Sequence, residues 1–68
     1  MKSIRYELYF RTFTQDGKIE MESITKYKFK TLEEAQQQQT MLNRNLRYKG
    51  YNDRKYIILK ITREYIKE

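Results

Sequence analysis

Cysteine, histidine and proline are missing from this 68-residue chain, and glycine occurs only twice. Without cysteine, disulfides, iron–sulfur clusters and thiolate metal sites are excluded. Without histidine, the chain lacks the commonest transition-metal ligand and the commonest general base. A chain this short buries only about 60% of the surface that its unfolded form exposes, so we expect marginal stability. Of the usual remedies, which are disulfides, a structural metal and self-association, the composition leaves self-association open.

Long apolar runs are also missing. The longest aliphatic run is Ile57-Ile58-Leu59, far shorter than the roughly 20 residues that span a bilayer. The residues after Met1 contain no apolar stretch of the kind found in signal sequences. We therefore expect a cytoplasmic protein that does not bind membranes. The abundance of Lys, Ile, Tyr and Asn suggests AT-rich coding DNA, as in low-GC bacteria and their phages.

The chain is basic, with a formal net charge of +6 and a pI near 9.7. Residues 1–34 carry seven Lys or Arg and six Asp or Glu, giving +1, whereas residues 35–68 carry eight and three, giving +5. The excess charge therefore belongs to the second half. A basic protein of this kind favours acidic partners, either nucleic acid or an acidic protein.

No catalytic motif is present. Ser3 and Ser23 have no histidine partner, so a Ser-His-Asp arrangement is impossible. Both glycines are explained by turns rather than by a phosphate-binding loop. Most of the carboxylates are better explained as solvated surface or helix-capping groups than as an acid/base pair. We therefore expect a protein that is not an enzyme and that uses no cofactor and no metal.

Two strands joined by a tight turn are predicted at the start of the chain. Apolar and polar residues alternate over residues 4–13, which is the period of a strand. Asp16-Gly17 is a strong hairpin signal because glycine tolerates a positive φ. A second strand is predicted over residues 18–29.

A helix over residues 32–49 and a third strand over residues 55–66 complete the prediction. Thr31 and Glu34 have the spacing of a capping box, in which the threonine accepts a hydrogen bond from the backbone three residues on. Gly50 fits the left-handed position that ends many helices. No proline interrupts the intervening residues.

The element order β-β-α-β predicts one α+β domain over residues 1–68. The third strand should pair beside the first, which gives a three-stranded antiparallel sheet of order 2-1-3 with the helix packed on one face. The apolar side chains expected between the sheet and the helix are Ile4, Tyr6, Leu8, Phe10, Met21, Phe29, Ile57, Leu59 and Ile61 from the strands, with Leu32, Ala35, Leu42 and Leu46 from the helix. Tyr65 is expected on the same side.

Two surfaces are candidates for binding. The first is a cluster of cations at the helix end and the following loop: Arg44, Arg47, Lys49, Arg54 and Lys55. The second is the sheet face that the helix leaves uncovered, whose expected members include Arg5, Tyr9, Arg11, Phe13, Ile24, Lys26, Tyr56, Ile58 and Lys60. Exposed apolar patches on small proteins often mark interfaces.

Two hypotheses remain open. In the leading one, the cationic cluster contacts a nucleic-acid backbone, and aromatics of the uncovered face could add base stacking. The cluster also has a local explanation, because cations near a helix C-terminus are stabilised by the helix dipole. In the alternative, the uncovered face binds protein, either a second copy of the chain in a homodimer or a host protein of the kind that small phage proteins modulate.

Overall fold

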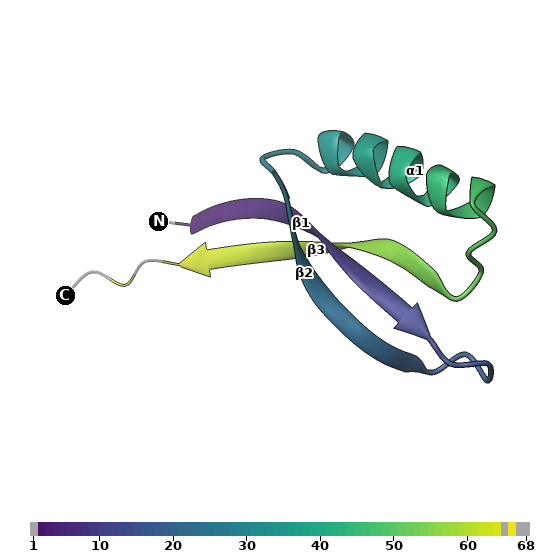
Figure 1. Ribbon diagram of the computed structural model, residues 1–68. Helices are drawn as coiled ribbons and strands as arrows, with labels where there is room; N and C mark the ends of the chain where they lie inside the picture. Colours follow the sequence, from purple (N-terminus) through teal and green to yellow (C-terminus); the bar gives the residue numbers. More distant parts are fainter. Residues whose placement is uncertain (1, 65, 67–68) are drawn as a thin grey trace.

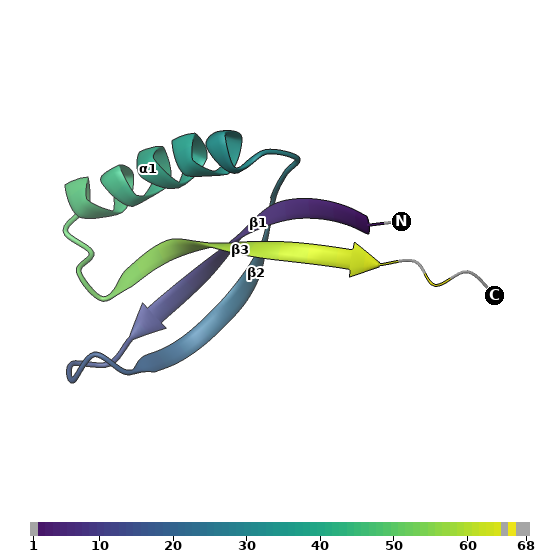
Figure 2. The ribbon, with the colours of Figure 1, turned by 180° about the vertical axis from the view of Figure 1, so that it is seen from behind.

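The computed structural model describes residues 2–64 and residue 66. The elements are β1 (Lys2–Phe13), β2 (Ile19–Phe29), α1 (Leu32–Tyr48) and β3 (Arg54–Glu64). The strands form an antiparallel sheet of order β2-β1-β3, and α1 lies along one side of it in both views (Figures 1 and 2). The predicted α+β architecture and strand order are confirmed. β3 ends two residues earlier than predicted, and Tyr65 lies outside the described residues.

Both ends of α1 follow the predicted signals. The Thr31 hydroxyl accepts from the Glu34 N–H at 3.2 Å and donates to the Glu34 carboxylate at 2.9 Å. At the other end, Gly50 has φ +85°, and its N–H donates to the Arg47 carbonyl at 3.0 Å. The Tyr51 N–H donates to the Leu46 carbonyl at 3.0 Å, which completes a Schellman motif. In the described part of the chain, no helix has the length and apolarity needed to cross a membrane.

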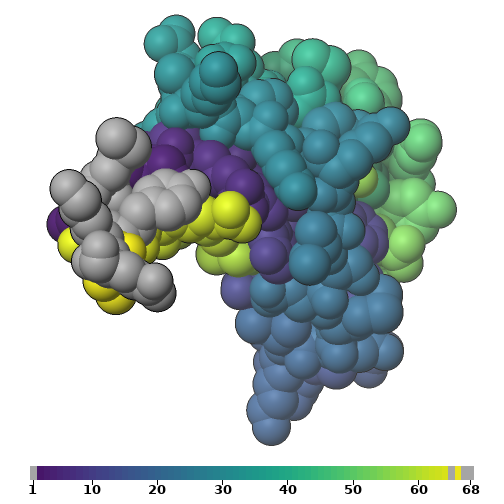
Figure 3. Space-filling model, turned by 90° about the vertical axis from the view of Figure 1, so that its left-hand side faces the viewer, coloured from purple at the N-terminus to yellow at the C-terminus, as the bar shows by residue number. Residues whose placement is uncertain are grey.

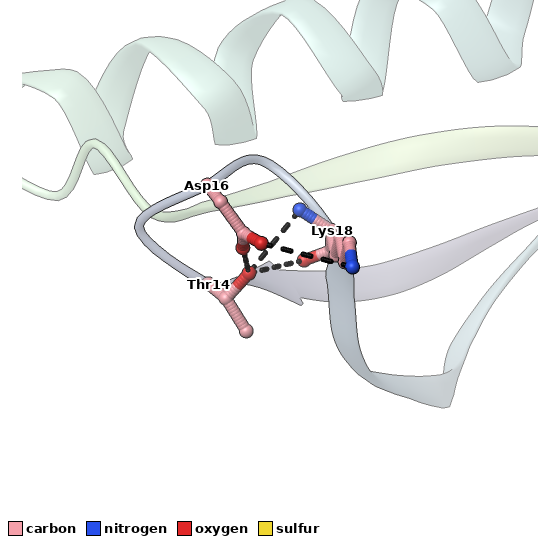
Figure 4. A network of polar contacts seen from close by, with 3 residues as sticks. All are labelled: Thr14, Asp16 and Lys18. Atoms are coloured by element: carbon pink, nitrogen blue, oxygen red, sulfur yellow. Dashed lines mark hydrogen bonds and ion pairs between the residues drawn. The ribbon is translucent and has the colours of Figure 1, made fainter.

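The hairpin turn is held by the side chain of Thr14 (Figure 4). Its hydroxyl donates to the Asp16 carboxylate and accepts from the Lys18 N–H at 3.2 Å. Gly17 has φ +87°, as the predicted Asp-Gly turn requires. The hydrogen bond from Thr14 is the main cause that lowers the pKa of Asp16 below its ordinary 3.8.

The core between α1 and the sheet is small. Leu8 and Ala35 are its fully buried apolar side chains within the described residues. Along β2, the residues that point toward α1 are half-buried from Ser23 to Phe29, whereas the alternate residues are exposed. The ring of Tyr56 joins this layer, 5.1 Å from the Phe10 ring. α1 therefore covers the face that carries Leu8 and Phe10.

Three side chains predicted for the core are largely exposed, namely Ile4 (46%), Met21 (53%) and Leu32 (42%). Their exposure follows from the lengths of the elements. A helix of 17 residues is about 26 Å long, whereas a strand of 12 residues reaches about 40 Å. α1 therefore covers only part of the sheet, and the strand ends extend beyond it.

The predicted facing of β3 is wrong. Directly paired residues of antiparallel strands point to the same face, and Leu8 pairs with Ile58 while Phe10 pairs with Tyr56. Tyr56, Ile58 and Lys60 therefore lie on the helix side, not on the uncovered face. The alternate residues of β3 point away from α1. They are Ile57, Leu59 and Ile61, which pair with Tyr9, Glu7 and Arg5, respectively. Because apolar residues occur on both faces of this strand, the apolar pattern alone does not predict which face packs against α1.

We expect Thr14→Val to raise the pKa of Asp16 toward 3.8, because the substitution removes the hydroxyl that stabilises the carboxylate. A lowered folded-state pKa contributes stability above the unfolded pKa, and this stability is lost as pH falls through the folded pKa. The variant should therefore lose less stability than the wild type below about pH 4. NMR titration of the carboxyl resonances measures the shift directly.

Asp53 is the internal control for this titration. Its pKa is also lowered, but mainly by a hydrogen bond from Arg54, so it should titrate alike in both proteins. An Asp16 pKa that stays low in Thr14→Val would contradict the assignment.

Candidate functional site

The amide of Asn43 holds α1 against the outer edge of β3. Its Oδ1 accepts from the Tyr56 N–H at 2.8 Å, and its Nδ2 donates to the Tyr56 carbonyl at 3.2 Å. Gln39 Nε2 donates to the same carbonyl at 3.1 Å. Since β3 is an edge strand, these amides take the place of a neighbouring strand at this residue. The second half of α1 is thereby fixed beside the loop that leads into β3.

A groove of about 430 Å³ lies between this half of α1 and the loop. We call it the basic groove, because three of the five predicted cations line it and no carboxylate does. Its lining residues are Gln39, Thr40, Asn43, Arg47, Tyr51, Asn52, Arg54 and Lys55.

The other two cations of the predicted cluster do not line the basic groove. Arg44 is exposed on α1, and Lys49 is the exposed C-cap residue of the helix. The structure therefore divides the cluster into three parts: Arg47 and Arg54, which line the groove; Lys55, which borders it but whose Nζ lies 5.4 Å from the centroid of the Phe13 ring; and a peripheral pair, Arg44 and Lys49.

Arg54 is held in place by Tyr51 and Asp53, which lie shortly before it in the chain. Its Cζ lies 4.2 Å from the centroid of the Tyr51 ring, and its Nε donates to Asp53 Oδ1 at 3.0 Å. This hydrogen bond lowers the pKa of Asp53 and raises the pKa of Arg54. A guanidinium fixed in this way loses less side-chain entropy when it binds a ligand. In the sequence Tyr51 stands three residues before Arg54, but this spacing does not predict that the ring stacks on the guanidinium.

A second groove, of about 500 Å³, lies on the other side of the loop. It shares Asn52, Arg54 and Lys55 with the basic groove and extends to the hairpin turn at residues 14–17. The Phe13 N–H donates to the Asp53 carbonyl at 2.6 Å, which ties the turn to the loop. No sequence pattern predicts this contact between the hairpin turn and the loop, because the two segments lie about 40 residues apart in the chain.

The sheet face away from α1 is the second candidate surface, and we call it the open face. Five predicted members lie on it: Arg5, Tyr9, Arg11, Phe13 and Ile24. Lys26 lies on the same face as Ile24, two residues further along β2. The register adds Glu7, Glu22, Lys28, Lys55, Ile57, Leu59 and Ile61 to the face. It is therefore more aliphatic than the sequence predicted.

Two of the three arginines of the open face, Arg5 and Arg11, are already paired within the sheet, and the third, Arg63, stands exposed opposite Ser3 near the end of β3. Arg5 Nε lies 2.6 Å from Glu7 Oε2, and Arg11 Nε lies 2.7 Å from Glu22 Oε2. Glu7 is only 5% exposed. Phosphate binding at Arg5 or Arg11 would compete with these carboxylates, just as phosphate binding at Arg54 would compete with Asp53.

In the comparisons with protein families, with curated proteins and with solved structures, nothing matched this chain. Over residues 2–64 and 66, no three acidic side chains gather in a way that could hold a metal ion. The geometry of the two surfaces is therefore the basis for a functional proposal.

We expect Asn43→Ala to destabilise the protein by about 1–3 kcal/mol, because the substitution leaves the Tyr56 N–H without its acceptor and the Tyr56 carbonyl with Gln39 as its remaining amide donor. Urea unfolding followed by circular dichroism measures the loss. Asn45→Ala is the matched control on the same helix, since Asn45 is exposed. Equal stability losses in the two variants would show that the edge contact contributes nothing beyond helix propensity.

Proposed function

We propose that this protein is a non-enzymatic module that binds the backbone of nucleic acid through the basic groove. The observation that carries the proposal is the convergence of Arg47 and Arg54 on one groove whose lining includes Lys55 and no carboxylate, with Asp53 as the partner of Arg54 outside the lining. Cations that face a common groove can neutralise neighbouring phosphates and release their counterions, which drives backbone binding.

Two further features support this choice. The excess positive charge lies in residues 35–68, the half of the chain that supplies the whole groove, so the long-range field favours approach of a polyanion. Arg54 presents a planar guanidinium, the group best suited to bidentate phosphate contacts. The lack of histidine and cysteine agrees with a binding role rather than catalysis. The proposal places the protein in the cytoplasm, where nucleic acid is accessible.

A second candidate function is protein binding through the open face. It is favoured by the aliphatic row of Ile57, Leu59 and Ile61 beside Tyr9, and by Ile24, which is 71% exposed. Tyrosine and arginine, the residues most enriched in interface hot spots, also occur on this face. The two functions use opposite sides of β3 and are compatible in one molecule.

We expect Arg47→Gln/Arg54→Gln to weaken oligonucleotide binding about tenfold or more at 50 mM salt, because the substitutions remove two of the convergent cations. The log–log slope of affinity against salt should become shallower by about one to two, at 0.7–0.9 per phosphate contact. Fluorescence anisotropy with labelled single- and double-stranded oligonucleotides measures both quantities. Lys55 is left unchanged because it also lies on the open face.

Arg44→Gln/Lys49→Gln is the matched control. It removes the same net charge from the same region but leaves the lining of the groove intact, so its loss of affinity should be much smaller. Equal losses of affinity in the two double variants would show that binding depends on the net charge of this region rather than on the groove. No binding by the wild type at about 50 mM salt would overturn the proposed function.

A further inference from the structure

The protein exposes more surface than its mass predicts. Its accessible surface is 5815 Å², whereas a monomer of 8.5 kDa typically exposes about 4,650 Å². Even full solvation of residues 1, 65, 67 and 68 would account for at most roughly 800 Å² of this area. At least a few hundred Å² of the excess therefore belongs to the described residues.

The buried core is also small for an independent fold. Between residues 2 and 64, only Leu8 and Ala35 are fully buried apolar side chains. A single core in a chain of this size seldom provides enough stability by itself, and natural proteins add disulfides, a metal or a partner. The chain has no cysteine for a disulfide. Burying more apolar surface against another chain would supply what this core lacks.

The open face has the chemistry of a surface that can be buried against its own copy. Its centre is aliphatic, with Leu59 flanked by Ile57 and Ile61 on β3. Arg5 and Arg11 are neutralised by Glu7 and Glu22 of the same chain, so covering these two arginines leaves neither of them unpaired and requires no acidic partner. The lysines at positions 26 and 28 lie exposed on the edge strand β2, and Lys55 and Arg63 lie exposed near the two ends of the edge strand β3, so that all four can remain solvated at a rim.

The shape of this side agrees with a large contact. In the space-filling view, the β1–β2 hairpin projects away from α1 and beyond the rest of the sheet (Figure 3). A partner seated on the open face beside this hairpin would contact both the aliphatic centre and the hairpin. Standard interfaces bury about 800 Å² on each partner, which is comparable with the excess surface of this chain.

We propose that the open face is covered by a second copy of this chain in a two-fold symmetric dimer. A two-fold contact requires only that one patch be compatible with itself, and an aliphatic centre with internally paired charges meets this requirement. The inference does not rest on nucleic-acid binding, because it uses the face opposite the basic groove; of the residues that line the groove, only Lys55 also lies on the open face.

Light scattering coupled to gel filtration, on nuclease-treated protein, tests the dimer. The wild type should have twice the 8.5 kDa mass of the chain, and Ile24→Glu should have the single-chain mass. Because Ile24 is exposed in one chain, its substitution should leave the fold of the monomer intact. Met41→Glu is the matched control, since Met41 is an exposed apolar residue on α1 (55%), and it should remain dimeric.

A single-chain mass for the wild type at about 100 μM would overturn the dimer. A dimeric Ile24→Glu, or a monomeric Met41→Glu, would overturn the choice of the open face. If Ile24→Glu unfolds, the concentration dependence of wild-type thermal unfolding decides, because the midpoint of a dimer rises with protein concentration and that of a monomer does not.

Discussion

The contact on which the rest of this structure depends is the pair of hydrogen bonds between the Asn43 amide and the backbone of Tyr56. α1 presents few large apolar side chains to the sheet, and its one fully buried residue is the small Ala35. A side-chain amide that pairs with an edge strand fixes both the position and the rotation of the helix. It also occupies backbone groups that would otherwise be free to pair with another chain. The walls of the basic groove, α1 and the loop before β3, owe their spacing to this contact.

The parts of the fold that could be predicted are those fixed by neighbouring residues. Thr31 and Glu34 set the start of the helix, Gly50 sets its end, and Asp16-Gly17 sets the hairpin, each within about five residues. The facing of β3 could not be predicted in this way. Residues 56–59 are apolar at every position, so both faces satisfy the pattern. Which face of β3 points toward α1 depends on the residue that the Asn43 amide binds. That residue, Tyr56, lies 13 positions further along the chain.

The same distinction separates the predictable and unpredictable parts of the candidate site. Composition located the excess charge in the second half of the chain. Of the five cations named from it, Arg44, Arg47 and Lys49 lie at the end of α1, whereas Arg54 and Lys55 are the first two residues of β3. Which of them converge depends on side-chain geometry. Arg47 lines the groove and Arg44, one turn earlier, does not. On the open face, the pairing of Arg5 with Glu7 follows from strand alternation, but that of Arg11 with Glu22 depends on the register across the hairpin.

The corrected facing of β3 changes the balance between the two surfaces. With Tyr56, Ile58 and Lys60 turned toward α1, the uncovered side loses an aromatic, an aliphatic and a cation and gains Lys55, Ile57, Leu59 and Ile61. Aliphatic side chains add little to base stacking but much to the burial of apolar surface. Because successive residues of a strand point to opposite faces, β3 places Arg54 at the basic groove and Ile57 on the open face. In the proposed dimer, covering the open faces would therefore leave both basic grooves accessible, so that one particle could contact a nucleic-acid backbone at two places.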